Sequence, residues 1–179
     1  METPKTAMLG VETQKECNSN HKLFDKWVLW AHLPHDTDWS LDSYKKIMTI
    51  DTVENMIAVS RGIPEKMVKN CMLFIMREGI SPTWEDERNR SGGCFSFKVT
   101  NKSVHSVWKN MGYMLVGETL SNNNKLLSNI NGITISPKRS FCIIKVWTSN
   151  CSHKEPTLLS DIPELSKHGC LFKRHIPEF

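Results

Sequence analysis

The sequence predicts an α+β protein with a curved, mostly antiparallel β-sheet and helices on one face. Short runs rich in β-branched and aromatic residues recur along the chain, as strands do. Only three segments have the periodicity of an amphipathic helix. The expected order is strand, strand, helix, strand, strand, helix, hairpin, helix, strand. With 179 residues, of which 39% are hydrophobic and 23% charged, the chain can form one domain with a sizeable core.

Composition limits the function before any motif is considered. The net charge of +4 permits an anionic partner but does not require one. Neither a membrane-length apolar run nor a signal pattern is found, so we expect no membrane association and a cytoplasmic location. The six cysteines have no metal-binding spacing, which favours reduced thiols and no metal site. No nucleotide-loop or hydrolase motif occurs, so no cofactor is expected.

The chain begins with a polar stretch and then enters its first strand. Residues 1–20 show no periodicity and predict a disordered tail, so the folded domain is expected over 21–179. Residues 26–33 are aromatic and β-branched, which predicts a strand. Trp27 and Trp30 should then point to opposite faces of the sheet, because they are an odd number of residues apart.

A loop, a strand and the first helix follow. The polar loop carries Trp39, and a short strand is expected over 43–50. Asp51 and Glu54 have the spacing of a capping box, with Asp51 as the helix N-cap. Gly62 and Pro64 should end the helix. Its apolar and small positions at helical spacing are Val53, Met56, Ile57 and Ser60.

Two strands joined by a long charged loop form the central part of the sequence. The strands are expected over 70–77 and 94–99, and the loop covers residues 80–93. The loop ends in a double glycine, which permits unusual backbone angles. Structureless loops of this length are uncommon in compact domains and are often functional.

This loop places Trp84 directly before Glu85. An indole offers a flat apolar face, and a carboxylate accepts two parallel N–H bonds. Together they suit a planar ring with a donor edge, above all a purine. The alternative is that Trp84 packs at the edge of the core and the neighbouring acids are only solvated.

The second half of the chain predicts a helix, a hairpin and a last helix and strand. A helix is expected over 103–120, with Trp108 in the core, followed by a polar loop at 121–124. Strands over 127–136 and 140–148 should form a hairpin. The remaining expected elements are a helix over 156–168, ended at Gly169, and a strand over 170–176.

Three features converge on one family. They are the pairs Asp38-Trp39 and Trp84-Glu85, and Trp147 behind a basic turn. In this order and spacing they resemble the cap-binding translation initiation factor 4E family, from about His21 to the C-terminus. Further matching pieces are Trp27-Val28-Leu29-Trp30, Asp51-Thr52-Val53-Glu54, Gly92-Gly93 and Gly117-Glu118. The resemblance implies a curved antiparallel sheet, like a cupped hand, with three helices on its convex face.

The resemblance also implies a ligand and its contacts. Family members bind the 7-methylguanosine cap of mRNA in the concave face. Trp39 and Trp84 are expected to sandwich the methylated guanine, and Glu85 to accept bonds from its N1 and N2 donors. The Trp84 backbone N–H is expected to meet O6, and Trp147 to contact the methyl group. A methylated guanine is cationic, and a cation over a desolvated indole gains about 2 kcal/mol.

The expected phosphate contacts depart from the family pattern. Lys138 and Arg139 stand at the matching basic turn. Ser140 and Ile143 replace family lysines, and Cys94 replaces a family arginine. The basic residues that could compensate are Arg88, Arg90, Lys145 and Lys173.

The expected partner surface departs further. The family receives initiation factor 4G and 4E-binding proteins on its helical back, by a helix-in-groove contact. The resemblance places His21, Leu23, Val53, Ile57, Lys109 and Asn110 there. Ile57 replaces a central tryptophan, and Lys109-Asn110 replaces a Leu-Glu pair.

Two alternatives to an initiation factor stay open. A cap-binding repressor or decoy would keep the cap site and not engage factor 4G. A metal-dependent nucleotide hydrolase would use Glu85, Asp86 and Glu87, but three consecutive acids do not easily converge on one ion.

Overall fold

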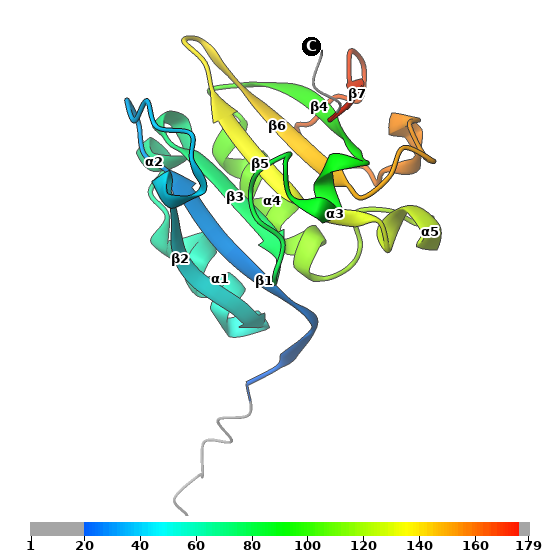
Figure 1. The fold of residues 1–179 in the computed structure, drawn as a ribbon, viewed down its shortest axis with the longest axis horizontal. Helices are drawn as coiled ribbons and strands as arrows, with labels where there is room; N and C mark the ends of the chain where they lie inside the picture. The colour runs from blue at the N-terminus through cyan, green and yellow to red at the C-terminus, as the bar shows by residue number, and fades with distance from the viewer. Residues whose placement is uncertain (1–19, 176–179) are drawn as a thin grey trace, which may run out of the picture.

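The protein is a seven-stranded sheet with three helices behind it (Figure 1). The computed structural model describes residues 20–175, so the predicted tail lies outside the described residues except for residue 20. The strands are β1 (Lys22–His32), β2 (Tyr44–Thr52), β3 (Met72–Arg77), β4 (Gly93–Thr100), β5 (Ile130–Pro137), β6 (Phe141–Thr148) and β7 (Leu171–Arg174). Their order in the sheet is β2-β1-β3-β5-β6-β4-β7. Every neighbouring pair is antiparallel, which confirms the predicted class.

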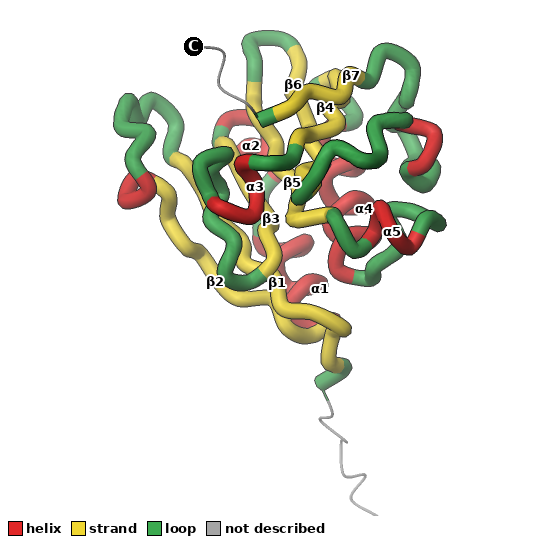
Figure 2. The backbone as a smooth tube through the Cα atoms, turned by 45° about the vertical axis from the view of Figure 1, so that its right-hand side comes forward, coloured by secondary structure: helices red, strands yellow, loops and turns green. Residues whose placement is uncertain are grey.

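One face of the sheet is covered and the other is open. The covering helices are α1 (Val53–Gly62), α2 (Glu65–Asn70) and α4 (Val104–Val116). Two further helices of one turn, α3 (Glu87–Arg90) and α5 (Asn124–Leu127), lie in loops. Figure 2 shows α3 standing on the side of the sheet away from α1 and α4. In the described residues, no helix is long and apolar enough to cross a membrane.

The two faces bury different tryptophans, as predicted. Trp27 is fully buried with Trp108 in the main core between sheet and helices. Trp30 packs on the open face against a second, smaller cluster that includes Phe74 and Trp147. The alternation of the strand therefore directs aromatic residues both to the core and to the floor of the open face.

The N-cap of α1 differs from the prediction. Thr52, and not Asp51, caps the helix, and its hydroxyl accepts the N–H of Asn55 at 3.1 Å. Glu54 does not bond back to the cap. Its carboxylate instead accepts the backbone N–H of His21 at 3.0 Å and contacts the His21 ring at 2.7 Å. The capping-box prediction was wrong because a partner distant in sequence takes the glutamate.

This cap gives a direct stability test. Thr52→Val keeps the side-chain shape but removes the acceptor, so we expect it to lower the free energy of unfolding by about 1 kcal/mol. Thr52→Ser keeps the oxygen and should retain most of that stability. Urea denaturation of both variants measures the difference, and equal midpoints would contradict the assignment of Thr52 as the cap.

Short helices were missed because four to six residues show no usable periodicity. Pro64 is expected from the sequence only to end the preceding helix. In the structure it occupies the N-cap position of α2. Asn123 caps α5, where only a polar loop was expected, and accepts the N–H groups of Lys125 and Leu126. As a result β3 and β5 begin two to three residues later than predicted.

The last predicted helix, over 156–168, was also wrong. Only Pro156–Leu158 forms a 3-10 turn, and the rest of the segment is irregular. Pro163 has no N–H, and Glu164 has a φ of 64°. The backbone N–H of Ser160 bonds to the carbonyl of Leu120 at 2.8 Å. This hydrogen bond to the loop after α4, and not hydrogen bonds within a helix, therefore holds the segment in place.

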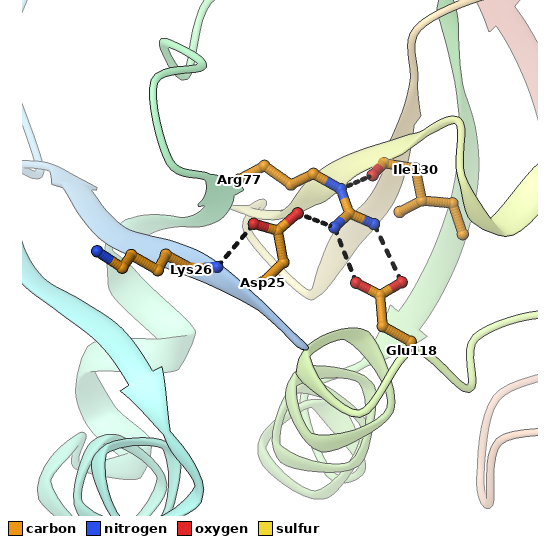
Figure 3. Close-up of polar contacts among 5 residues, drawn as sticks. All are labelled: Asp25, Lys26, Arg77, Glu118 and Ile130. Carbon is orange, nitrogen blue, oxygen red and sulfur yellow. Dashed lines mark hydrogen bonds and ion pairs between the residues drawn. The ribbon is translucent and has the colours of Figure 1, made fainter. Parts of the chain in front are cut away.

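A partly buried ion pair joins the sheet to the end of α4 (Figure 3). The Arg77 guanidinium donates to Glu118 at 2.8 and 3.1 Å and to Asp25 at 2.6 Å. It also donates to the carbonyl of Ile130 at 2.8 Å and lies 4.4 Å from the centre of the Trp27 ring. One side chain on β3 thus fixes β1, α4's exit loop and the start of β5.

Candidate functional site

The open face holds a cavity of about 280 Å³ that brings the predicted base-binding residues together. Trp39, Trp84, Glu85 and Trp147 all line it. They come from three separated parts of the chain: the loop before β2, the loop after β3, and β6. The remaining lining residues are Tyr44, Met72, Phe74, Pro82, Thr83, Thr134, Ser136 and Lys145.

Trp39 is supported from behind by a histidine. The ring of His32 stacks on it with centroids 4.3 Å apart and planes 2° from parallel. His32 is almost fully buried, and its Nε2 lies 2.8 Å from the carbonyl oxygen of Asp38. Tyr44 contacts the same imidazole edge-on at 5.1 Å. The indole of Trp39 is 58% exposed, so it offers area to a ligand from a braced position.

The loop carrying Trp84 is rigidly organised. Asp86 caps α3, and its carboxylate accepts the N–H groups of Ser81 at 2.7 Å and Arg88 at 2.9 Å. Asn89 is fully buried and donates to the carbonyls of Ser81 at 3.0 Å and Thr83 at 2.8 Å. Trp84 itself remains 39% exposed. The loop therefore presents an indole in a fixed place, and Asp86 is structural.

The double glycine behind the loop has a packing role. Neither glycine has a positive φ, so the loop does not use the unusual backbone angles that glycine permits. A Cβ on Gly92 would lie 1.7 Å from the carbonyl oxygen of Thr148. A Cβ on Gly93 would lie 2.5 Å from that of Lys173. Only glycine lets the end of the loop pass this close to β6 and β7.

Glu85 and the phenol of Tyr44 line the same cavity. Burial raises the pKa of Tyr44, and the negative charge of Glu85 raises it further. The Glu85 side chain is itself exposed, so its carboxylate is accessible to a ligand.

Trp147 is covered by a residue of the C-terminal segment. It is 6% exposed, and the His175 ring lies 4.6 Å away at a tilt of 53°. The Nδ1 of His175 is 2.9 Å from the carbonyl oxygen of Asn89. Burial lowers the pKa of His175, and the charge of Lys145 also lowers it. A neutral imidazole therefore ties the C-terminal segment to the Trp84 loop.

A second cavity, of about 810 Å³, adjoins the first. The two share Trp84, Ser136, Lys145 and Trp147. The basic residues that line the second cavity are Lys98, Lys138, Lys145, Lys173 and Arg174. We name this space the basic cavity.

The sequence identified some of these cations and missed others. Lys138 lines the basic cavity as predicted, whereas its neighbour Arg139 is exposed and lines neither cavity. Of the compensating residues, Lys145 and Lys173 line the basic cavity, but Arg88 donates to the carbonyl of Gly79 instead. Arg90 also lines neither cavity. Among the lining residues that the sequence missed, Lys98 and Arg174 reach the site through the pairing of β4 with β6 and β7. Tyr44 and His175 were missed as well.

The predicted partner-binding residues all lie on the helical side. His21 and Leu23 precede and begin β1, Val53 and Ile57 are on α1, and Lys109 and Asn110 are on α4. Val53 is 42% exposed, and its N–H bonds to the carbonyl of His21. Lys109 is exposed, with its ammonium 6.0 Å from the centre of the Tyr113 ring.

The fold and the site together define a binding protein, with an aromatic and acidic pocket beside a basic cavity on an open antiparallel sheet. A family model for eukaryotic initiation factor 4E matches residues 22–168. The translation initiation factor 4E of Eremothecium gossypii is 31% identical over 166 residues, covering 89% of this chain and 72% of that protein. The chain belongs to the eukaryotic initiation factor 4E family.

Other relatives and solved structures agree. The factor 4E of Candida albicans is 26% identical over 154 residues, covering 80% of this chain and 72% of that protein. C. elegans eIF4E-3, solved with the 4E-binding protein Mextli and a cap analog, is similar with a TM-score of 0.67 and 24% identity, covering 75% of this chain and 77% of that one. Ascaris suum eIF4E-3 with an m7G cap has a TM-score of 0.64 and 25% identity, with 75% and 76% covered.

Proposed function

We propose that this protein binds the 7-methylguanosine cap of mRNA and acts in translation initiation in the cytoplasm. One observation carries the proposal: Trp39, Trp84, Glu85 and Trp147 line a single cavity that opens into the basic cavity. Structures of the family solved with cap ligands support it.

In the proposed complex the methylated guanine lies between Trp39 and Trp84. Each indole is partly exposed and lines the cavity, so a flat ring can lie against both. Stacking on an aromatic side chain is worth about 1–3 kcal/mol per base. The positive charge on the methylated base adds about 2 kcal/mol when desolvated. Trp147, which also lines the cavity, contacts the methyl group in this arrangement.

The phosphates extend from this pocket into the basic cavity. Lys145 lines both cavities and therefore stands where the triphosphate begins. Lys138 lies farther along the basic cavity, at the β5–β6 turn. Lys138 keeps the basic position of the family pattern, and Lys145 compensates for the cations that are absent at Ser140, Ile143 and Cys94.

Tryptophan fluorescence tests the proposal directly. Titration with 7-methyl-GTP should quench the emission, because the ligand covers two indoles, while unmethylated GTP should quench much more weakly. Equal responses to the two nucleotides, or none to either, would refute a cap site.

Glu85 should select the base. Glu85→Gln places an amide where both guanine donors expect an acceptor, and charge-assisted bonds are worth about 1.5–3 kcal/mol. We expect the affinity for 7-methyl-GTP to fall about tenfold or more in equilibrium titrations. Wild type should also discriminate against 7-methyl-inosine triphosphate, which lacks the 2-amino donor, and the variant should lose that preference. Glu87→Gln is the matched control, since Glu87 does not line the cavity and should behave as wild type.

A translational repressor remains the second candidate, and the helical face favours it. Ile57, Lys109 and Asn110 stand where the family carries an aromatic and an acidic contact for factor 4G. Capture of a factor 4G-type scaffold by the purified protein would support initiation. Capture of only a 4E-binding protein, with cap binding intact, would support repression.

The contacts of Asp86 argue against the hydrolase alternative. Asp86 is occupied as the cap of α3, accepting two backbone N–H groups. No group of three or more His, Cys, Asp or Glu side chains suited to a metal was found among residues 20–175.

A further inference from the structure

A row of aromatic rings runs beneath one wall of the base pocket. The Trp39 indole stacks on the imidazole of His32, with centroids 4.3 Å apart and planes 2° from parallel. Tyr44 contacts that imidazole edge-on at 5.1 Å, and Phe74 contacts Tyr44 edge-on at 5.5 Å. His32 is the member of this row that does not line the base pocket. It can therefore act on a ligand in the pocket only through its neighbours.

The hydrogen bond of His32 fixes both its tautomer and the loop that carries Trp39. The Nε2 atom lies 2.8 Å from the carbonyl oxygen of Asp38, which can only accept a hydrogen bond, so Nε2 carries a hydrogen. Asp38 directly precedes Trp39, so this bond and the ring stack hold the same short piece of chain. In the neutral ring the lone pair is on Nδ1, and this atom takes the proton when the imidazole becomes charged.

The strands beside His32 bring no charge to it. Tyr44, on β2, faces the imidazole. Burial raises the pKa of this phenol, and the charge of Glu85 raises it further, so the phenol stays neutral at the pH values where imidazoles titrate. On β3, Met72 pairs with His32 and has no titratable group.

The loop before β2 brings an ionised carboxylate. The pKa of Asp38 is lowered first by hydrogen bonds from the backbone and the hydroxyl of Ser40, each at 2.8 Å. The charges of His32 and Lys45 lower it further. A charge on the imidazole is therefore felt by the loop that carries Trp39.

A charge on His32 opposes the charge that the proposed ligand brings. A methylated guanine is cationic and is attracted to the electron-rich face of an indole. An imidazolium on the other face of the same indole competes for that attraction. The two cations would lie about twice the 4.3 Å stacking distance apart. His32 is almost fully buried, so salt screens this repulsion less than it would screen a repulsion at the surface.

We propose that His32 is a positioning residue for cap binding: its neutral ring holds Trp39 for the methylated base, and protonation of that ring weakens the complex. The inference rests on the proposed cap function and adds a residue that acts on the base without contacting it. The affinity for 7-methyl-GTP is then expected to fall about three- to tenfold as the pH drops through the range where imidazoles titrate.

The test compares the full-length wild type with His32→Phe in titrations with 7-methyl-GTP from about pH 8 down to about pH 5.5. Phenylalanine keeps a ring that can stack but has neither the bond to the Asp38 carbonyl nor a charge. We expect the variant to bind about two- to tenfold more weakly at the higher pH, because that bond is lost. The ligand and His175 titrate in both proteins, so the ratio of the two affinities isolates His32. The wild-type advantage should shrink as the pH falls.

Two further measurements sharpen the test. His35→Asn removes an exposed imidazole from the same loop, and asparagine tolerates the φ of 67° at that position, so this control should follow the wild-type profile. Coupling between two binding events is reciprocal. In NMR spectra of the wild type, 7-methyl-GTP should therefore make the His32 ring take up its proton at a lower pH.

The outcomes separate this inference from the cap function. A wild-type affinity that falls no more steeply with pH than that of His32→Phe overturns the inference, and so does a flattened profile in His35→Asn. If His32→Phe does not fold, the NMR titration decides alone, and a His32 ring that responds to pH identically with and without ligand overturns the inference. Each of these results leaves the cap function standing. Absence of 7-methyl-GTP binding by the wild type would overturn both.

Discussion

Trp84→Ala is expected to reduce the affinity for 7-methyl-GTP by about 100-fold or more. The variant removes one wall of the proposed sandwich, and stacking together with the cation–π attraction is worth about 3 kcal/mol or more. Fluorescence titration of the variant, supported by calorimetry, measures the loss. Trp84→Phe should recover part of the affinity, because a smaller ring still stacks.

The same variant should remain folded, which keeps the result interpretable. Trp84 is 39% exposed, and the loop around it is held by Asp86 and Asn89, which the substitution leaves in place. We expect the urea midpoint to stay within experimental error of wild type. Wild-type affinity in a folded Trp84→Ala protein would eliminate the sandwich, whatever else binds at the open face.

Arg77→Met is expected to lower the free energy of unfolding by about 3 kcal/mol. Glu118 is 19% exposed and would lose both of its bonds to the guanidinium (Figure 3). Burial alone disfavours the charge on Arg77, but Glu118 and Asp25 outweigh it, so the pKa of Arg77 lies above its ordinary value. The carbonyl of Ile130 would also lose its donor. Urea or thermal denaturation measures the change.

A solvent-exposed pair provides the comparison. Lys22 contacts Asp51 at 3.0 Å, but its side chain is 73% exposed. Lys22→Met should therefore cost less than about 1 kcal/mol. Equal stability of the two variants would contradict a structural role for the ion pairs of Arg77, since removing one member of a partly buried pair leaves an uncompensated charge.

The two predictions differ in whether the sequence alone suggests them. The proposed role of Trp84 can be inferred from the sequence, because a tryptophan beside an acid in a long polar loop is poorly placed to join a core. The importance of Arg77 cannot, because Asp25 and Glu118 are 52 and 41 residues away from it. Nothing local in the chain distinguishes Arg77 from a solvated arginine at a strand end.

The helical side of the sheet likewise has some features that the sequence predicts and others that it does not. The sequence placed the amphipathic segment of α4 and the core position of Trp108 correctly, since burial on one helical face repeats at a regular spacing. It assigned Glu54 to a local cap, whereas His21, 33 residues away, takes that carboxylate. Local hydrogen-bond patterns compete with tertiary partners, and sequence spacing does not show which will prevail.

The sequence by itself determined the sheet and the main helices, because hydrophobic periodicity is a local signal. Trp39, Trp84, Glu85 and Trp147, which line one cavity in the structure, were singled out by their order and spacing through the resemblance to the family. The tertiary structure decided where the cations gather. Lys98, Lys145 and Lys173 are ordinary strand lysines in the sequence, and only the antiparallel pairing of β4 with β6 and β7 brings them to one cavity. Register is a property of the folded sheet, so the basic cavity could be recognised only there.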